Sequence, residues 1–459
     1  MKCWKTNSKR IRKTYDSKGV VKQISPWMKH LIPILFSCLF LISCSSAKKL
    51  NRQLSQQFNA EVFEKSFTGF MVYDPGKKKV LFELNSQKYF TPASNIKLLT
   101  FYAGLKVLED SLPALKYAVK NDSLVFWGTG DPSMLYSDLP QSKAVSFLKN
   151  RKEILQYLPP VFTEEHFGPG WAWDDYNSYY SVERSAFPIY GNYAVFEFFP
   201  GKPFPVSSPA IFKRNLIPHQ ENSERIRRTL EKNTFLYKPF TEEKRFTQKV
   251  PFKYSDELFA ELLGDTLQKP VEILKIKPKD LSETKTIYSI ASDSLYKQML
   301  QQSDNFLAEQ TLLMVAGKIS DSLKTDIAIS HILDQHLQDL PDKPNWVDGS
   351  GLSRYNLITP RSMVFLLQKI AEIMPSQRLF SLLPAGGRSG TIKNSYLARE
   401  PYIFAKTGTL RNNHALSGFL RTKSGKVLIF SFMNANYPDS SAEIKKQMEL
   451  ILNGIHEIY

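Results

Sequence analysis

Two groups of β-rich segments lie at opposite ends of this 459-residue chain. Near the N-terminal end, residues 67–73 and 79–84 are rich in β-forming residues and flank an Asp-Pro-Gly turn, as the strands of a hairpin do. Near the C-terminal end, residues 402–409, 414–421 and 426–434 are typical of three antiparallel strands, and an amphipathic helix follows them. Because helical patterns lie between the two groups, we expect one sheet built from both ends of the chain.

A serine and a lysine three residues apart follow the first hairpin. They are Ser94 and Lys97, in the segment PASNIKLLT, where Pro92 or Ser94 begins a helix that we expect to end near Glu109. Residues three apart share one face of a helix, so the lysine amine can lie beside the serine hydroxyl. A lysine whose pKa is lowered by burial or by a second cation can take the serine proton. The spacing therefore predicts Ser94 as nucleophile and Lys97 as base.

The S-x-x-K spacing alone is weak, because it recurs in the chain at Ser45, Ser46, Ser146, Ser282 and Ser294. Two further motifs strengthen the hypothesis. The segment SDN at 303–305 is the only S-x-N in the sequence, and KTG at 406–408 is one of two K-[ST]-G matches. The other match, at 423–425, falls where a hairpin turn is expected. A glycine within a strand, such as Gly408, lets a substrate approach the backbone closely.

These three motifs occur in the order found in penicillin-binding proteins and serine β-lactamases. With GTGDPS, GPGWAWDD, SDNFLAE, DGSGLSRYN and AKTGTLRN, the chain resembles the low-molecular-mass class C penicillin-binding proteins over about residues 60–440. Those proteins are D-alanyl-D-alanine carboxypeptidases and endopeptidases. The resemblance implies an α+β fold of the DD-peptidase and serine β-lactamase type, an antiparallel sheet flanked by helices. It also implies a large, mostly β domain inserted between the first and second motifs.

The resemblance implies a role for each motif residue. Ser94 would attack the D-Ala-D-Ala carbonyl with Lys97 as base, and water would then release the acyl-enzyme. Ser303 would relay a proton to the leaving amine, and Asn305 would hold Lys97 or the substrate amide. Lys406 would supply positive charge for the terminal carboxylate. It would also depress the pKa of Lys97.

Substrate binding would extend beyond the catalytic residues. The residues implied at the strand are Thr407, Gly408 and Thr409. Backbone N–H groups of Ser94 and Thr409 would form the oxyanion hole, where one donor is typically worth ~3–4 kcal/mol. β-Lactams would act as inhibitors, because they mimic the dipeptide and stall at the ester.

A segment of the expected insertion matches the family stretch that lines a subsite near the active serine. Its residues are Asp174, Trp171 and Tyr179. A carboxylate there could pair with the free amine of a peptidoglycan stem side chain. Asp175 is the alternative carboxylate, and a structural role is open for both. Most other aromatic residues of this region are typical of a core.

The N-terminus resembles an export signal. A basic leader precedes an apolar run over residues 31–42, which is too short to span a bilayer but suits the core of a signal peptide. The sequence LISC ending at Cys44 resembles the lipobox of bacterial lipoproteins. We therefore expect a signal peptide over 1–43 and a lipid on Cys44, with an ordinary signal peptide as the alternative. Translation starts at Met1 or Met28.

The length is too great for one ordinary core, so we expect more than one domain. We predict a polar tether over 44–58, a peptidase domain made of 59–115 and 271–459, and an inserted domain over 116–270. Only one of the three cysteines, Cys44, remains after the expected cleavage, so we predict no disulfide framework.

The net charge of +17 arises partly from the leader, where nine basic residues and one acidic residue precede Cys44. We expect peptidoglycan stem peptides as substrates, β-lactams as inhibitors and a bacterial membrane bound through the lipid, which gives a periplasmic, lipid-anchored location. Export and the lack of a recognisable motif argue against a nucleic-acid partner. We predict no metal and no cofactor, because the seven histidines form no H-E-x-x-H motif.

Two alternatives to a DD-peptidase stay open. One is a serine β-lactamase, which has the same fold and motifs and would turn over a β-lactam rapidly. The other is a catalytically inactive, peptidoglycan-binding lipoprotein. The intact motifs argue against the second alternative, since a binding protein has no need of Ser94 and Lys97 together.

Overall fold

The computed structural model describes residues 48–160, 162–220, 224–275, 281, 283–320, 322–438 and 440–459. The expected signal peptide, the lipobox with Cys44 and both candidate start residues lie outside these ranges. All elements named below belong to one unit, residues 50–459. No helix among the described residues is both long enough and apolar enough to span a membrane.

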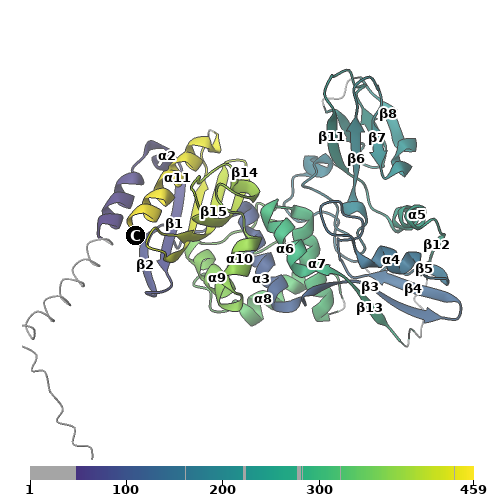
Figure 1. Cartoon of the computed structure of the whole chain (residues 1–459), viewed down its shortest axis with the longest axis horizontal. Helices are drawn as coiled ribbons and strands as arrows, with labels where there is room; N and C mark the ends of the chain where they lie inside the picture. Colours follow the sequence, from purple (N-terminus) through teal and green to yellow (C-terminus); the bar gives the residue numbers. More distant parts are fainter. Residues whose placement is uncertain are drawn as a thin grey trace, which may run out of the picture. The chain divides into compact units, whose positions relative to one another are not determined.

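The predicted sheet built from both chain ends is confirmed. Its strand order is β14-β15-β16-β1-β2, and all neighbouring strands are antiparallel. The strands are β1 (Phe67–Asp74), β2 (Lys79–Leu84), β14 (Ile403–Leu410), β15 (Asn413–Arg421) and β16 (Val427–Ala435). Figure 1 shows the purple first strands beside the yellow last ones. The second K-[ST]-G match lies, as predicted, in the turn between β15 and β16.

Helices cover both faces of this sheet. On one face lie α11 (Ser441–Ile458), the short α2 (Glu61–Glu64) and the helical residues 50–57. On the other face α9 (Pro360–Ile373) contacts β1 and β16 and connects the sheet to a helical layer. The further helices of this layer are α3 (Lys97–Val107), α6 (Ser292–Gln301), α7 (Asn305–Ser320), α8 (Thr325–His336) and α10 (Ser376–Leu382).

The described part of the expected tether is not an open linker. Leu50, Leu54 and Phe58 are buried in the core beneath α11. Their spacing of four residues places them on one face of a helix, which packs against the sheet. The polar residues between them hide this apolar stripe when composition alone is considered, and the folded part therefore begins earlier than residue 59.

Between α3 and α6 the chain forms three further sheets, in the orders β12-β5-β4-β3-β13, β8-β10-β9 and β11-β6-β7. Their strands are β3 (Ser111–Lys120), β4 (Ser123–Gly128), β5 (Ile154–Tyr157), β6 (Tyr193–Phe198), β7 (Val206–Ser208), β8 (Leu216–Pro218), β9 (Ile226–Arg228), β10 (Phe235–Tyr237), β11 (Phe246–Pro251), β12 (Val271–Ile273) and β13 (Lys285–Ala291). The described residues of this region also form the α-helices α4 (Lys143–Lys149) and α5 (Asp256–Leu267). We call residues 111–291 the inserted region. It is mostly β, as predicted, but wider than 116–270, because β13 pairs with β3.

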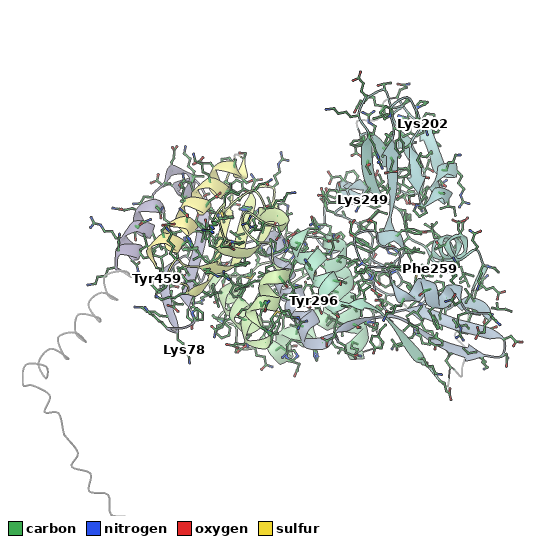
Figure 2. The ribbon with its side chains drawn as sticks, in the orientation of Figure 1. Lys78, Lys202, Lys249, Phe259, Tyr296 and Tyr459 are labelled. Carbon is green, nitrogen blue, oxygen red and sulfur yellow. The ribbon has the colours of Figure 1, made fainter. Side chains whose placement is uncertain are left out.

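The inserted region has an apolar core of its own, rich in aromatic rings. Tyr157 and Phe259 lie with ring centroids 4.6 Å apart, and Phe187 packs on Phe259 at the same centroid distance. Figure 2 labels Phe259 in this core and Tyr296 in the helical layer. These aromatic side chains are core residues, which leaves a smaller group of aromatics for the surface and the candidate site.

The sheet core allows a direct test of its packing. Phe70 is fully buried, and its ring lies 4.7 Å from that of Phe432 on the neighbouring strand, centroid to centroid. We expect Phe70→Ala to lower the free energy of unfolding by about 3–5 kcal/mol, because it leaves a cavity in the core between the sheet and the helices that cover this face. Phe67, on the same strand, is 66% exposed, so Phe67→Ala should change that free energy by less than about 0.5 kcal/mol. Equal losses in urea unfolding would contradict this packing.

Candidate active site

Ser94 lies in a 3-10 turn, η1 (Ala93–Ile96), that leads directly into α3. The expected helix therefore begins as a tighter turn and ends at Val107 rather than Glu109. Ala93 has a φ of 49°, in the left-handed region that non-glycine residues rarely adopt. The residue before the candidate nucleophile is thus held in a strained conformation, as is common at functional sites.

Lys97 is fully buried and donates three hydrogen bonds. Its Nζ lies 2.9 Å from Ser94 Oγ, 2.6 Å from Asn305 Oδ1 and 2.7 Å from the carbonyl oxygen of Ser350. Burial lowers the pKa of Lys97 to about 8, although nearby carboxylates oppose the shift. A buried amine with this pKa can exchange a proton near neutral pH.

Lys406, on β14, is the second buried amine of the site. Its Nζ donates to Ser303 Oγ at 2.8 Å and to the carbonyl oxygen of Thr407 at 2.7 Å. Burial, and then the charge of Lys97, hold the pKa of Lys406 well below its usual range. Sequence analysis expected burial and the charge of Lys406 to lower the pKa of Lys97. Burial is the main cause, because the Lys97 amine lies among side chains that exclude water.

Strand β14 passes very close to the turn that carries Ser94. Asn95 Nδ2 donates to the carbonyl oxygen of Lys406 at 2.9 Å. A Cβ on Gly408 would lie 2.2 Å from the carbonyl oxygen of Pro92 and 3.0 Å from Ser94 N. Only glycine therefore allows this approach, which brings the KTG strand against the serine turn. Sequence analysis expected Gly408 to let a substrate approach the backbone, whereas here the chain's own backbone makes the close approach.

Two side chains that sequence analysis missed hold the threonines of β14. Thr391, in the short helix η5 (Gly390–Ile392), shares a hydroxyl–hydroxyl hydrogen bond of 2.7 Å with Thr407. His414 Nδ1 lies 2.8 Å from Thr409 Oγ1. Burial is the main cause that lowers the pKa of His414 to about 3, so this histidine is neutral near pH 7. The β14–β15 register pairs Thr409 with His414, which is the signal that could have found it.

The DGSGLS segment, residues 348–353, holds the Lys97 amine through the carbonyl of Ser350. Gly351 has a φ of 79°, and a Cβ there would lie 1.9 Å from the carbonyl oxygen of Ala93. Ser350 accepts from Lys97 through its carbonyl, while its N–H donates to Glu309 Oε1 at 2.8 Å. Burial and the neighbouring Asp348 raise the pKa of Glu309 to about 7. Sequence analysis used this segment only as one of those that carry the family resemblance and gave its residues no role.

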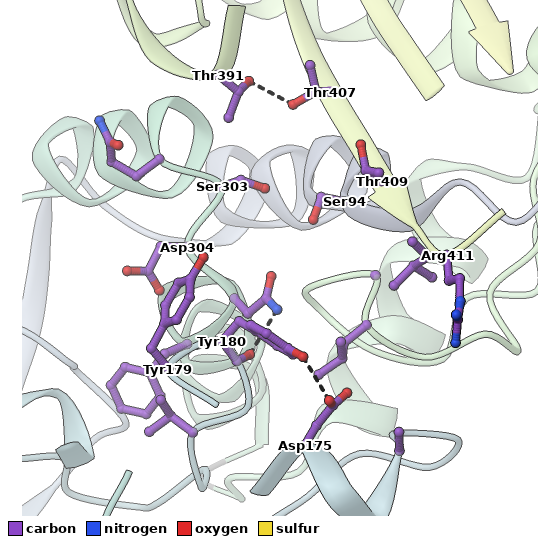
Figure 3. A pocket seen from close by; sticks show the side chains of 18 of the residues that line it. Ser94, Asp175, Tyr179, Tyr180, Ser303, Asp304, Thr391, Thr407, Thr409 and Arg411 are labelled. Carbon is purple, nitrogen blue, oxygen red and sulfur yellow. Dashed lines mark hydrogen bonds between the residues drawn. The ribbon is translucent and has the colours of Figure 1, made fainter. Parts of the chain in front are cut away.

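An open cleft of about 1580 Å³ leads to the motif residues (Figure 3). Its lining includes Ser94 and Ser303 on one side and residues of the inserted region on the other. Asp174, Asp175 and Tyr179 line it too. Sequence analysis also proposed Trp171 for substrate binding, but this residue is not part of the lining. Its indole N–H instead donates to Asp348 Oδ2 at 2.9 Å.

The middle residue of the SDN motif faces the inserted region. Asp304 Oδ2 accepts a hydrogen bond from the Tyr136 hydroxyl, and its Oδ1 accepts from Leu307 N at the start of α7. Burial raises the pKa of Asp304 and also that of Tyr136. Within the described ranges, no three His, Cys, Asp or Glu side chains gather as metal ligands would.

Comparison with known proteins places this site in a family. Residues 50–454 match the D-Ala-D-Ala carboxypeptidase 3 (S13) family, and the chain belongs to it. The chain is 25% identical to the D-alanyl-D-alanine carboxypeptidase DacB of Haemophilus influenzae, across 86% of this chain and 91% of that one. It is also 32% identical to the carboxypeptidase DacB of Mycolicibacterium smegmatis, over 36% of this chain and 39% of that protein.

Solved structures show the same fold. Penicillin binding protein 4 (dacB) from Haemophilus influenzae matches with a TM-score of 0.68 and 21% identity, over 88% of this chain and 99% of that one. The same protein complexed with a novel β-lactam matches with a TM-score of 0.66, 19% identity and the same coverage. The predicted α+β fold with an antiparallel sheet flanked by helices is confirmed.

The close approach at Gly408 can be tested by one added methyl group. We expect Gly408→Ala to lower the thermal unfolding midpoint by several degrees, because the Cβ would clash with the backbone of Pro92. Gly454→Ala, in α11, is the matched control. The atoms nearest to its Cβ would belong to the flexible ends of Gln53 and Gln57, and alanine favours a helix, so the midpoint should stay or rise slightly. Two equal midpoints would contradict the tight contact.

Proposed function

We propose that this protein is a serine DD-peptidase, which hydrolyses D-Ala-D-Ala termini or D-Ala cross-links of peptidoglycan through an acyl-enzyme on Ser94. The observation that carries the proposal is the hydrogen bond of 2.9 Å between the buried amine of Lys97 and Ser94 Oγ. Membership of the S13 family supports the reaction class. The names of the relatives, which are carboxypeptidases, support the substrate class.

In the proposed acylation, neutral Lys97 takes the proton of Ser94 as Oγ attacks the carbonyl carbon. Asn305 Oδ1 and the carbonyl of Ser350 hold the amine in place for this transfer. The carbonyl oxygen becomes an oxyanion, which backbone N–H groups of Ser94 and Thr409 would stabilise. The position of β14 against the serine turn supports this pair of donors.

The leaving amine needs a proton, and the proposed route to it passes through Ser303. Its hydroxyl accepts from Lys406 Nζ at 2.8 Å, so Ser303 can give its own proton and receive one from Lys406. Lys406 would then regain the proton that Lys97 took from Ser94, which leaves Lys97 neutral and Lys406 charged again. Lys406 and Thr407 would bind the terminal carboxylate, and Gly408 would let their strand lie close to Ser94. A water molecule then hydrolyses the ester on Ser94, which restores the free hydroxyl.

The exposed carboxylate of Asp174 supports a role in recognising the stem peptide. Across the described part of the chain this side chain has no hydrogen-bond or ion-pair partner, and it faces the cleft. It is therefore free to pair with an ammonium group of a substrate side chain. Tyr179, which is 69% exposed at the same cleft, can offer its ring to the aliphatic part of that side chain.

We also propose export and lipid attachment at Cys44, which would place the enzyme in the periplasm on a bacterial membrane. The sequence pattern LISC after an apolar run of signal-peptide length supports this location. Residues 1–43 would then be removed. Peptidoglycan would be the partner, and β-lactams would be inhibitors that acylate the same serine.

The nucleophile is tested with a labelled penicillin and intact-mass measurement. We expect a stable 1:1 adduct on the wild type and none on Ser94→Ala, because the ester forms on Oγ. Ser146→Ala is the matched control, since Ser146 has the same S-x-x-K spacing in α4 and its exposed hydroxyl donates to the carbonyl of Lys143. This control should be labelled like the wild type.

Two other results would change the proposal. Rapid hydrolysis of the penicillin without an accumulating adduct would indicate a serine β-lactamase. Neither adduct nor hydrolysis, from protein with a cooperative thermal transition, would favour an inactive peptidoglycan-binding protein.

The role of Lys97 as base predicts a pH dependence. With its pKa at about 8, the neutral fraction of Lys97 rises from about 10% at pH 7 to about 90% at pH 9. We therefore expect the second-order rate constant of acylation to rise through about pH 8 and then level off. A stopped-flow series from pH 6 to 9.5 with a fluorescent penicillin measures this, and a flat profile would contradict the assignment.

A further inference from the structure

The second K-[ST]-G match, residues 423–425, lies at one end of the sheet built from both chain ends. It belongs to segment 422–426, which carries the turn between β15 and β16. Segment 75–79, at the turn between β1 and β2, lies beside it, because the end of β1 pairs with the start of β16. Five of the ten residues in these two segments are lysines, and none is acidic. We call the two segments together the basic end of the sheet.

The C-terminal residue, Tyr459, joins the two segments. Lys77 Nζ lies 5.2 Å from the centroid of the Tyr459 ring, and Lys426 Nζ lies 4.3 Å from it. The Tyr459 hydroxyl donates to Asp74 Oδ2 at 2.8 Å, and Ser424 Oγ donates to the main-chain oxygen of Tyr459 at 2.9 Å. Because Tyr459 is buried, it holds both turns from below, and the lysines of the two segments form one surface. Figure 2 labels Tyr459 in this part of the molecule.

The lysines of this surface carry charge that the protein leaves largely unpaired. Lys77, Lys78 and Lys79 are exposed, and none of the three forms a salt bridge within the part of the chain that the structure describes. Lys423 is exposed too and pairs with Glu457. A concentration of lysines with so few carboxylates attracts a polyanion or an anionic surface.

The first helix of the unit 50–459 starts beside the basic end. Asn51 Nδ2 donates to the carbonyl oxygen of Leu81, two residues after Lys79, at 3.0 Å. Cys44, where we propose the lipid, precedes Leu50 by six residues in the sequence. Six residues span at most about 22 Å when the chain is fully extended. A lipid on Cys44 would therefore keep a bilayer within reach of these lysines.

The basic end lies far from the catalytic cleft. Helix α11 runs from one to the other, because Ser441 at its start lines the cleft and Tyr459 follows its last residue. The 18 residues of this helix span about 27 Å. A bilayer bound at the basic end would therefore have the cleft on the far side of the sheet, facing away from it.

We propose that the basic end of the sheet docks on the anionic headgroups of a phospholipid bilayer and thereby directs the cleft away from the membrane, toward peptidoglycan. The proposal rests on the lipid attachment proposed above, because the lipid brings the bilayer close. Each lysine near an anionic bilayer raises the binding constant by about fivefold. The lipid supplies the attachment, whereas the lysines determine which face of the protein meets the bilayer.

Vesicle sedimentation tests the docking in the absence of the lipid. Residues 50–459 form one unit, so the chain from residue 45 onward is suited to this measurement. We expect it to sediment with vesicles that contain about 40% phosphatidylglycerol, but not with pure phosphatidylcholine, and to dissociate at about 0.5 M salt. The combined changes Lys77→Glu, Lys78→Glu and Lys79→Glu should lower the partition coefficient by at least about tenfold.

A control variant carries the same change of net charge elsewhere. It combines Lys213→Glu, Lys232→Glu and Lys244→Glu, at exposed positions of the inserted region. This variant should bind the vesicles within about twofold of the wild type, because charges more than a Debye length from the bilayer are screened. Both variants should keep the thermal midpoint of the wild type and its labelling by penicillin, since none of these lysines lines the cleft. Equal losses of vesicle binding in the two variants would overturn the proposal, as would a wild type that does not sediment with anionic vesicles.

Isolated peptidoglycan is the competing anionic ligand. If the wild type sediments with peptidoglycan but not with the vesicles, and the variant of residues 77–79 loses this binding, the surface binds the wall and the proposal is overturned. Absence of labelled palmitate from the full chain expressed in bacteria would overturn the anchored orientation. Penicillin labelling reports separately on the peptidase. A wild type that binds anionic vesicles without being acylated would overturn the proposed peptidase function and support the docking surface.

Discussion

The structure depends on the burial of one amine, that of Lys97. An amine removed from water destabilises a fold unless acceptors replace its hydration. Lys97 finds its acceptors in three segments that are far apart in sequence, namely the turn at Ser94, the start of α7 at Asn305 and the loop at Ser350. The buried amine has all three of its acceptors only when all three segments are in place. The position of these segments is therefore as much a condition for stability as for the proposed chemistry.

Two glycines make this arrangement possible at the backbone level. Gly351 approaches the carbonyl of Ala93, and Gly408 approaches that of Pro92, each too closely for a Cβ. The serine turn is thereby enclosed between the DGSGLS loop and strand β14. Because β14 is held in a sheet built from both ends of the chain, the register of that sheet sets the position of the motif lysine on it. Close packing here leaves little freedom to the left-handed Ala93, which stays in its strained conformation.

Much of this arrangement could be predicted from the sequence, because it depends on side-chain type and periodicity. The strand pattern predicted the composite sheet, and the spacing of Ser94 and Lys97 predicted a shared face. The amide of Asn305 donates from Nδ2 to the backbone carbonyl of Tyr180 at 2.9 Å. The type of a side chain carries no information about contacts made by a backbone carbonyl, so the sequence held no signal for this hydrogen bond. Thr391 was missed for a related reason: it meets Thr407 only because η5 and β14 lie side by side in the fold. The apolar face formed by Leu50, Leu54 and Phe58 was missed because polar residues lie between them in the sequence.

The inserted region is joined to the catalytic part by buried polar contacts, which argues that it is integral to the site. Gln310 of α7 donates to the carbonyls of Gly130 and Ser185 at 2.8 and 2.9 Å. Nη1 of Arg184, in the inserted region, lies 3.5 Å from Oε2 of Glu309, and both side chains are fully buried. Arg184 also lies 3.4 Å from Glu164, between Nη2 and Oε1, so it links two carboxylates. An unpaired buried charge costs several kcal/mol, so removal of Arg184 would leave Glu309 without its cation. Glu309 in turn holds the Ser350 peptide that accepts from Lys97. The inserted region and the catalytic base therefore share one continuous polar interior, and neither can change its position without disturbing the other.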